Sequence, residues 1–409
     1  MNEPKLRFKA DDGSQFPDWE EKKLGDITEK VVRKDANSNA DVRMISQGNG
    51  FILQSDKYSR ENAGQSLKKY TLLKRDEFAY NHGASKVKPY GVCYRLCESD
   101  EARVPYVYHT FKLIDGDSVF WNYSLNTSCM DRQLKKMVSS GARMDGLLNI
   151  GYDAYMSVDI HVPSLPEQQK IAEFLSTIDT VIEKQKETVF AWEERKKGVM
   201  QKLFNQEVRF KADDGSDFPE WAEKKIDDVA TCFAGATPST KIPEYWEEGT
   251  IRWMSSGEVN NGQIHDTEKR ISQLGFDKCS TKMVKPNSVV MALAGQGKTR
   301  GMVAITRVPL CTNQSLCAIE TNDDICDDYL YQYLQTQYNN LRLISSGDGT
   351  RGGLNLKLVG GYVVIVPCLA EQQKIADCLS SSDEVIEKQK ATLAAWEELK
   401  KGLLQQMFV

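Results

Sequence analysis

One long segment occurs twice in this chain of 409 residues, and the repeat limits the folds that the chain can adopt. Residues 162–204 return as residues 366–408, with identical residues at most positions. A shorter phrase is also repeated, as RFKADDGSQFPDW from Arg7 and RFKADDGSDFPEW from Arg209. Such repetition indicates a structural unit that is built twice. The stretches between the repeats differ in sequence, so we expect one scaffold that carries two different surfaces.

The repeats divide the chain into five segments. We expect a leader at 1–27, a first variable domain at 28–161, a spacer helix with a second leader at 162–229, a second variable domain at 230–365 and a second spacer helix at 366–409. If both leaders occupy equivalent places, the first leader must pack near the C-terminal helix. The two halves would then be related by a pseudo-two-fold internal repeat.

The two repeated tails have the apolar spacing of coiled-coil helices. Apolar residues recur in steps of three and four, and neither tail contains proline after its start. The predicted seam consists of Ile171, Leu175, Ile182, Gln185 and Trp192 in the first tail, and of Ile375, Leu379, Ile386, Gln389 and Trp396 in the second. An amphipathic helix needs a partner for its apolar stripe, so we predict a long antiparallel coiled coil between the tails. An ordinary oligomerisation coil is the alternative that the pattern leaves open.

The two variable domains share landmarks in one order. The first landmark is an apolar strand that ends in a polar turn, the second is a glycine-bearing basic loop between two strands, and the third is a Gly/Ser turn that holds an arginine. The landmarks are 42–48, 76–96 and 138–149 in the first domain, and 251–257, 287–308 and 344–355 in the second. A helical stretch precedes the third landmark in each domain. We therefore predict two α/β domains in a chain that is α+β overall.

Basic residues gather in two places, although the chain as a whole is acidic. The net charge is −5, which alone argues against a nucleic-acid partner. Residues 68–95, however, include seven basic and two acidic residues, and residues 279–319 include five basic residues and no acidic residue. Such local basic surfaces attract phosphate groups.

The loops that carry these basic residues are the predicted DNA contacts. Lysine and arginine side chains on small-residue loops can reach phosphates or base edges, and they occur at matched places in both domains. We predict contacts by Gln47, Asn81, His82, Lys86, Lys88 and Arg143 in the first domain, and by Ser256, Gln296, Lys298, Arg300 and Arg351 in the second. For any single residue, a solvated basic turn is the alternative.

Other kinds of site are disfavoured by residue spacing. The ten cysteines include no C-x-x-C pair and the four histidines are scattered, which argues against a metal site and for reduced thiols. The stretch GQGKT at 295–299 lacks the glycine that a P-loop requires at the position of Ala292. The sequence has neither the pattern of a signal peptide nor a run of apolar residues as long as a membrane span. We expect a cytoplasmic protein without catalytic residues.

Several short motifs accompany the repeats. EQQKIA and IEKQK occur in both tails, and the second half contains ATPST at 236–240, YW at 245–246, IRW at 251–253 and TNQS at 312–315. Together with doubled tails around divergent domains, these motifs resemble the DNA-specificity subunits of type I restriction-modification systems. The resemblance covers essentially the whole chain.

The resemblance implies a role in DNA recognition, with partners that perform the chemistry. Two target-recognition domains would each read one half of a bipartite asymmetric sequence in double-stranded DNA, and the helices would set the gap. Two modification subunits would supply adenine N6 methylation, and restriction subunits would supply ATP-driven translocation and cleavage. No cofactor is expected in this chain, whereas S-adenosylmethionine, ATP and Mg are expected on the partner subunits. A non-enzymatic coiled-coil adaptor with two protein-binding domains is the alternative.

Overall fold

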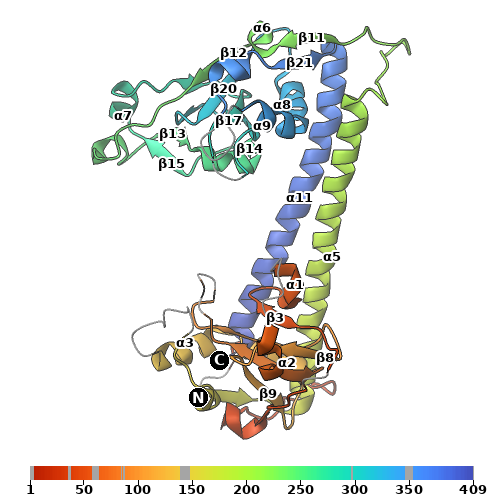
Figure 1. Cartoon of the computed structure of the whole chain (residues 1–409), viewed down its shortest axis with the longest axis vertical. Helices are drawn as coiled ribbons and strands as arrows, with labels where there is room; N and C mark the ends of the chain where they lie inside the picture. The colour runs from red at the N-terminus through yellow and green to blue at the C-terminus, as the bar shows by residue number, and fades with distance from the viewer. Residues whose placement is uncertain are drawn as a thin grey trace. The chain divides into compact units, whose positions relative to one another are not determined.

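The computed structural model describes residues 4–35, 38–57, 64–83, 85, 88–138, 148–295, 298–345 and 353–408. The chain forms two compact units, of which the first comprises Met1–Lys186 with Ala391–Val409 and the second comprises Glu187–Lys390. Both units contain sheets, short helices and part of two long helices, α5 (Leu165–Phe204) and α11 (Leu369–Met407) (Figure 1). The predicted α+β class with a pair of long helices is confirmed.

The described part of the first unit contains a four-stranded sheet, of order β2-β9-β6-β7, and the strand pairs β1-β10, β3-β4 and β5-β8. The strands are β1 (Glu20–Lys23), β2 (Thr28–Lys30), β3 (Arg43–Ser46), β4 (Gly50–Leu53), β5 (Thr71–Lys74), β6 (Phe78–Asn81), β7 (Val92–Arg95), β8 (Glu101–Val104), β9 (His109–Leu113) and β10 (Asp159–Val162). The short helices are η1 (Leu24–Ile27), α1 (Gln54–Lys57), η2 (Gly64–Lys69), α2 (Ser118–Ser124), α3 (Ser128–Met137) and α4 (Tyr152–Met156).

The described part of the second unit contains a five-stranded sheet, of order β12-β20-β17-β18-β14, a four-stranded sheet, of order β15-β13-β19-β16, and the pair β11-β21. The strands are β11 (Ala222–Lys225), β12 (Ala230–Ala234), β13 (Ile251–Met254), β14 (Gln263–Ile264), β15 (Lys269–Ile271), β16 (Met283–Val284), β17 (Val289–Ala292), β18 (Val303–Thr306), β19 (Leu310–Thr312), β20 (Leu316–Thr321) and β21 (Val363–Val366). The short helices are α6 (Ile226–Val229), η3 (Pro243–Tyr245), η4 (Ser256–Asn261), α7 (Gln273–Asp277), α8 (Asp327–Thr336), α9 (Tyr338–Ile344) and α10 (Leu356–Gly360).

The central strands of the second unit are buried along their whole length. All residues of β17 and β18 are buried, as are the first four residues of β20. Strands that are covered on both faces require continuous apolar runs, and VVMA and VAIT are such runs. The loop between β17 and β18 therefore starts and ends in the packed core of the sheet.

The two long helices run in opposite directions within the second unit. Lys390 of α11 pairs with Glu193 of α5 at 3.0 Å, and Lys196 of α5 pairs with Asp383 of α11 at 2.6 Å. Residue numbers therefore rise along one helix as they fall along the other. The prediction that the two helices are antiparallel is confirmed.

The predicted seam residues divide into buried and half-buried groups. The buried members are Ile171, Leu175, Ile182, Ile375, Leu379 and Ile386. The half-buried members are Gln185, Trp192, Gln389 and Trp396. In the first unit, Ile171 and Leu175 share a core cluster with Phe120 and Trp121 of α2. The apolar stripe thus also closes the core beside the helix, a role that the heptad pattern alone did not predict.

The repeated leader phrase builds a joint at the start of a long helix. In the second unit, the guanidinium of Arg209 donates to both carboxylate oxygens of Glu371, at 3.1 and 2.8 Å. The indole of Trp221 donates to the same carboxylate at 2.8 Å. Glu371 is fully buried in the first turn of α11. Because a buried carboxylate needs a partner, this residue fixes the leader to the helix.

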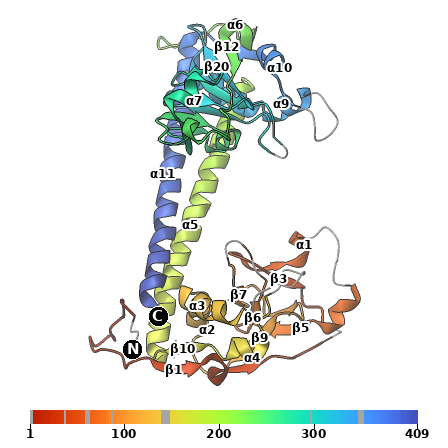
Figure 2. The same ribbon diagram turned by 90° about the vertical axis from the view of Figure 1, so that its left-hand side faces the viewer.

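The first unit contains the same joint, with the first leader in place of the second. Arg7 donates to both carboxylate oxygens of Glu167, at 3.0 and 2.9 Å, and Trp19 donates to this carboxylate at 3.1 Å. The amide of Leu6 donates to the carbonyl of Gln406 at 3.1 Å, so the first leader contacts the end of α11. Strand β1, which lies within this leader, pairs antiparallel with β10 (Figure 2). The leader sequence is therefore repeated because each unit uses it to form the same joint.

Candidate nucleic-acid interface

The basic loop of the second unit connects the buried strands β17 and β18. At the base of the loop, the amide of Gly301 donates to the carbonyl of Ala292 at 2.9 Å. Gly301 has a φ of 82°, in the left-handed region that favours glycine. Lys298 is exposed on this loop and Arg300 is half-buried. The sheet therefore gives the two basic side chains a rigid base.

Main-chain hydrogen bonds bring the three landmarks of the second unit together. The amide of Leu354, in the third landmark, donates to the carbonyl of Leu293 at the start of the basic loop (2.9 Å). The amide of Leu293 donates to the carbonyl of Ser315 (2.8 Å). The amide of Asn313 donates to the carbonyl of Met254, the last residue of β13 (3.1 Å). We call this set of bonds the recognition frame.

The first unit joins the same three landmarks, partly through side chains. The amide of Leu148, in the third landmark, donates to the carbonyl of His82 at the start of the basic loop (2.9 Å). A turn precedes β9, closed by a bond from the amide of Tyr108 to the carbonyl of Pro105 (3.0 Å). The amide of Ile45, in β3, donates to the hydroxyl of Tyr108 (3.2 Å). The first, second and third landmarks therefore also meet in this unit.

The ring of His82 is part of this frame. Its Nδ1 lies 2.8 Å from the carbonyl oxygen of Leu148, and its Nε2 lies 3.0 Å from that of Val107. The ring also stacks on His109, with 4.9 Å between the centroids. Both ring nitrogens therefore face the protein. Contact between His82 and DNA stays a prediction, and it would require the ring to leave these carbonyls.

Two other predicted residues of the first unit meet around Gly83. The side-chain amide of Gln47 donates to the carbonyl of Gly83 at 3.4 Å, and the side-chain oxygen of Asn81 accepts from the amide of Gly83 at 3.0 Å. Lys88 donates to the carbonyl of Asn126 at 3.1 Å. Gln47, Asn81 and Lys88 are all half-buried. The structure thus brings Gln47 and Asn81 together at the basic loop.

The remaining predicted contacts are less defined. Ser256 is half-buried and begins η4, directly after the first landmark strand of the second unit. Lys86, Arg143, Gln296 and Arg351 lie outside the described residues. Their contacts with DNA stay predictions.

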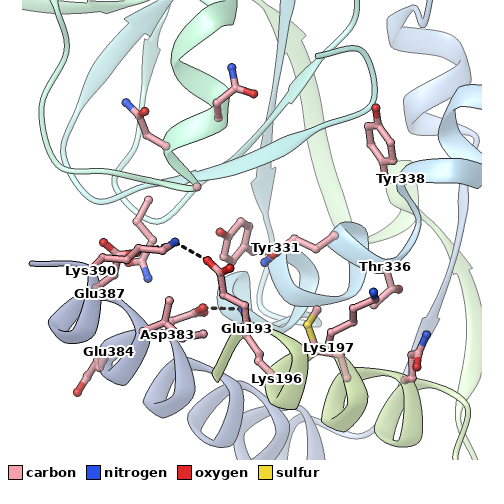
Figure 3. A pocket seen from close by; sticks show the side chains of 18 of the residues that line it. Glu193, Lys196, Lys197, Tyr331, Thr336, Tyr338, Asp383, Glu384, Glu387 and Lys390 are labelled. Atoms are coloured by element: carbon pink, nitrogen blue, oxygen red, sulfur yellow. Dashed lines mark hydrogen bonds and ion pairs between the residues drawn. The ribbon is translucent and has the colours of Figure 1, made fainter. Parts of the chain in front are cut away.

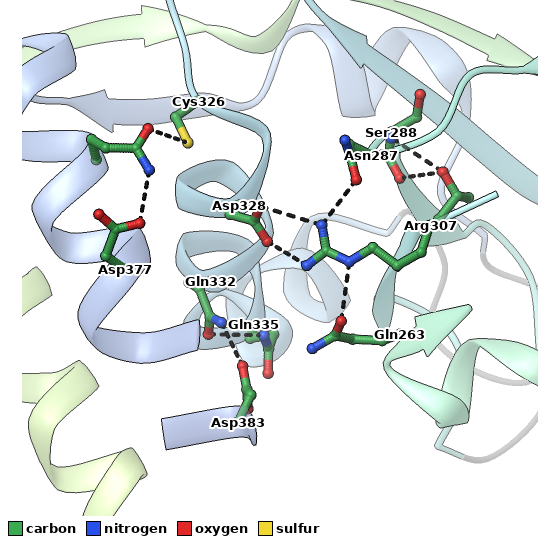
Figure 4. Close-up of polar contacts among 12 residues, drawn as sticks. Gln263, Asn287, Ser288, Arg307, Cys326, Asp328, Gln332, Gln335, Asp377 and Asp383 are labelled. Atoms are coloured by element: carbon green, nitrogen blue, oxygen red, sulfur yellow. Dashed lines mark hydrogen bonds and ion pairs between the residues drawn. The ribbon is translucent and has the colours of Figure 1, made fainter. Parts of the chain in front are cut away.

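Some of the basic residues in the basic stretches of the sequence are neutralised within the protein. Arg307 donates to the carboxylate of Asp328, at 2.6 Å to the nearer oxygen, to Gln263 at 3.0 Å and to Asn287 at 3.0 Å (Figure 4). Asp328 lies outside the basic stretch in the sequence. A count of charges within the stretch alone therefore overestimates the local positive charge. Arg307 instead joins β18, β14 and α8.

A family model matches most of the second unit and its frame. The type I restriction modification DNA specificity domain matches residues 219–395. These residues are similar to that domain family, and we call them the specificity domain. The resemblance that the sequence motifs indicated is confirmed.

Known proteins with a similar sequence and solved structures with a similar fold also come from type I restriction systems. The type I restriction enzyme MjaIX specificity subunit of Methanocaldococcus jannaschii is 31% identical over 211 residues, which cover 50% of this chain and 48% of the relative. The match therefore spans about half the length of that relative. The S subunit of a type I restriction-modification system from M. genitalium has a TM-score of 0.59 at 15% identity, over 100% of this chain and 99% of that chain.

A second solved structure has the same fold. It comes from work on complex assembly and conformational transition of the type I restriction-modification system, and its TM-score is 0.53 at 16% identity, over 96% of this chain and 98% of that chain. Both solved structures match nearly the whole chain, so the fold extends beyond the residues that match the specificity domain model.

The specificity domain also brings together three motifs that, in the sequence, carried only the resemblance. The indole of Trp253, in IRW, donates to the carbonyl of Ala236, in ATPST, at 3.0 Å. The hydroxyl of Thr237 donates to the side-chain oxygen of Gln314, in TNQS, at 2.6 Å. Thr237 and Gln314 are exposed. They were not among the contacts predicted from the sequence because the fold, and not their spacing, joins them.

A polar cleft lies where the long helices meet the specificity domain of the second unit (Figure 3). Its lining includes Lys196 of α5, Asp383 of α11 and Tyr331 of α8. The carboxylate of Asp383 accepts from Lys196 at 2.6 Å (Figure 3). It also accepts from Gln332 of α8 at 2.7 Å (Figure 4). Burial raises the pKa of Tyr331. Asp383 therefore connects both helices to the domain.

Neither a metal site nor a membrane span occurs within the described ranges. There, no group of three or more histidine, cysteine, aspartate or glutamate residues is arranged to bind a metal ion. No helix in this part of the chain combines the length and apolar character that crossing a membrane requires.

Proposed function

We propose that the chain is the DNA-specificity subunit of a type I restriction-modification complex and that each unit reads one half of a bipartite asymmetric DNA sequence. The recognition frame is the observation that carries this proposal. The bond between Leu148 and His82 in the first unit recurs between Leu354 and Leu293 in the second. A protein that recognises two different half-sites can use one arrangement of the polypeptide backbone with different side chains. Contacts with the DNA phosphates position such a protein, and contacts with the bases give specificity.

The basic loops supply attraction to the duplex and enter the major grooves of the two half-sites. An exposed lysine such as Lys298 neutralises a phosphate and releases counterions, whichever base lies nearby. Side chains on the frame then contact base edges, which differ between base pairs in the major groove. Loops held on a buried sheet are suited to this task because they bind without a large loss of conformational entropy.

The long helices set the gap between the half-sites and bind two modification subunits. Support comes from the polar cleft beside Asp383, where charged residues of both helices are accessible to a partner. In this proposal, the chain itself performs no chemistry. The modification subunits methylate adenine N6 with S-adenosylmethionine, and restriction subunits use ATP and Mg.

A map of N6-methyladenine in the source genome tests the proposal. The map is made with the gene intact, with the gene deleted, and with the deletion complemented. We expect one asymmetric motif, made of two parts with a fixed gap, to lose methylation on deletion and to regain it on complementation. Unchanged methylation of every motif on deletion would contradict the proposal, provided that the gene is expressed.

A further inference from the structure

A tight turn presents one exposed side chain at the same place in each unit. In the second unit, the amide of Leu316 donates to the carbonyl of Asn313 at 3.3 Å, and the exposed residue is Gln314. In the first unit, the equivalent bond joins Tyr108 to Pro105, and the exposed residue is Tyr106, which is 56% exposed. The turn is shared by the two halves of this chain, whereas the side chain at its tip differs.

The turn of the second unit lies inside the recognition frame. The carbonyl of Ser315 accepts a hydrogen bond from the amide of Leu293, which begins the basic loop. The amide of Asn313 donates to the carbonyl of Met254, the last residue of β13. The bonds on either side of Gln314 therefore connect its turn to the start of the loop that carries Lys298 and to the strand that precedes Ser256. A side chain at this place can approach a base edge when the basic loop contacts the neighbouring phosphates.

The carboxamide of Gln314 is held in place by a neighbouring side chain. The hydroxyl of Thr237 donates to its Oε1 at 2.6 Å, which uses one lone pair and leaves the other lone pair and both Nε2 hydrogens available. The segment that carries Thr237 is itself fixed, because Trp253 donates to the carbonyl of Ala236 and a side chain at Gly235 would collide with Thr312. Such support from rigid neighbours is what a specific contact requires.

We propose that Gln314 reads an adenine in the major groove of the second half-site and that Thr237 is its positioning residue. The inference rests on the proposed function. Adenine presents N6–H as a donor and N7 as an acceptor, so Oε1 accepts from N6 while Nε2 donates to N7. Guanine presents two acceptors, O6 and N7, and Oε1 would face one of them. The hydrogen bond from Thr237 limits the rotation of the Gln314 side chain and so holds the carboxamide where both contacts with adenine can form.

The test replaces the gene by variants and maps N6-methyladenine in the cells. Gln314→Ala should relax one A·T position of the second half-site, so that methylation at sites with another base pair there rises about 5-fold to 150-fold relative to the intact motif. Thr237→Val should relax the same position less than Gln314→Ala does and leave the other positions unchanged. Tyr106→Ala is the matched control, because it should alter the first half-site alone.

The outcomes separate this inference from the proposed function. If the wild-type gene controls a two-part motif but Gln314→Ala leaves every position as strict as before, Gln314 does not read a base and the inference is overturned. If Gln314→Ala relaxes the first half-site, the assignment of the turn to the second half-site is wrong. If no motif depends on the wild-type gene, the proposed function fails and the inference fails with it.

The purified full-length chain provides a second readout. Gln314 is neutral, so its removal should lower affinity for the duplex without changing the salt dependence of binding, which counts neutralised phosphates. An equal loss of affinity for duplexes with an intact and with a scrambled second half-site would show a contact with the DNA backbone and would overturn base reading.

Discussion

Lys196 of α5 donates to the carboxylate of Asp383 of α11 at 2.6 Å, and both side chains are nearly buried, at 9% and 17% exposed. The same carboxylate accepts from Gln332 of α8. The first unit contains an equivalent arrangement, in which Asp179 pairs with Lys400 at 2.5 Å and accepts from a tyrosine hydroxyl of α2. One aspartate in each unit therefore bonds to the opposite helix and to the neighbouring domain.

Loss of Lys196 should destabilise the second unit. Lys196→Met leaves Asp383 without its cation in a nearly buried place, so we expect the free energy of unfolding to fall by about 3 kcal/mol. Urea denaturation of the full-length chain measures the change. Lys401→Met is the matched control, because Lys401 and Glu398 are 64% and 73% exposed and such pairs contribute about 0.5 kcal/mol. Equal losses in the two variants would contradict the expected role of Asp383.

The two leader joints should contribute similar stability. Arg209→Met and Arg7→Met each leave a fully buried glutamate without its cation, so we expect losses of about 3 kcal/mol in both variants. Arg209→Lys should restore little, because lysine cannot donate to both carboxylate oxygens in the planar geometry of arginine. Lys211→Met is the control, since Lys211 pairs with an exposed carboxylate. A full rescue by lysine would mean that charge alone makes the joint.

The first unit should lose stability as the pH falls below 6.5. Burial lowers the pKa of His109 from its ordinary value of 6.5, and the positive charges of His82 and Lys30 act in the same direction. Between 6.5 and the lowered pKa, the unfolded chain binds more protons than the folded chain, so acidification favours unfolding. His109→Gln should show a smaller decrease in melting temperature between pH 7.5 and pH 5.5 than the wild type. Identical decreases would assign the pH dependence to other groups.

Two glycines should respond to alanine in opposite ways. A Cβ at Gly235 would collide with the backbone carbonyl of Thr312, which cannot rotate away, so we expect Gly235→Ala to cost about 2 kcal/mol. A Cβ at Gly198, in α5, would meet nothing within 4 Å, so Gly198→Ala should stabilise the chain by up to about 1 kcal/mol. Urea denaturation measures both variants. A neutral Gly235→Ala would show that the ATPST segment can move.

Removal of the basic side chains of the second loop should weaken one half-site only. We expect Lys298→Ala with Arg300→Ala to lower affinity for duplexes that contain the second half-site and to reduce the salt slope by about one for each phosphate that the loop no longer neutralises. Titrations at several salt concentrations, with either half-site scrambled, measure both effects. An equal decrease of affinity at both half-sites would point to nonspecific attraction.

The long helices could be predicted from sequence because their determinants are local. Steps of three and four between apolar residues, without proline, are sufficient to indicate α5 and α11. The role of Glu167 and Glu371 could not be predicted in this way. A glutamate at the start of a helix is usually solvated, and only the folded leader shows that these two are buried beside arginine and tryptophan.

The candidate site was predicted in part, for a similar reason. The basic loop around Lys298 is continuous in sequence, so its glycines and charges indicate a polar loop directly. The turn at Gln314 is placed by bonds between segments that are distant in sequence, such as the bond between Asn313 and Met254. The ring of His82 shows the converse case, because a polar residue on a predicted loop proved to be engaged by backbone carbonyls.

The recognition frame of the second unit consists of bonds between backbone groups, which every residue except proline can supply. Amino-acid substitutions at the tips of the turns therefore do not remove the hydrogen bonds that hold the landmarks together. Exposed tip residues such as Tyr106 and Gln314 can be exchanged with little loss of folding free energy, whereas the buried glutamates of the joints cannot change without their arginines. Under the proposed function, a lineage that carries this chain can thus acquire a new target sequence by mutation while its architecture is inherited unchanged.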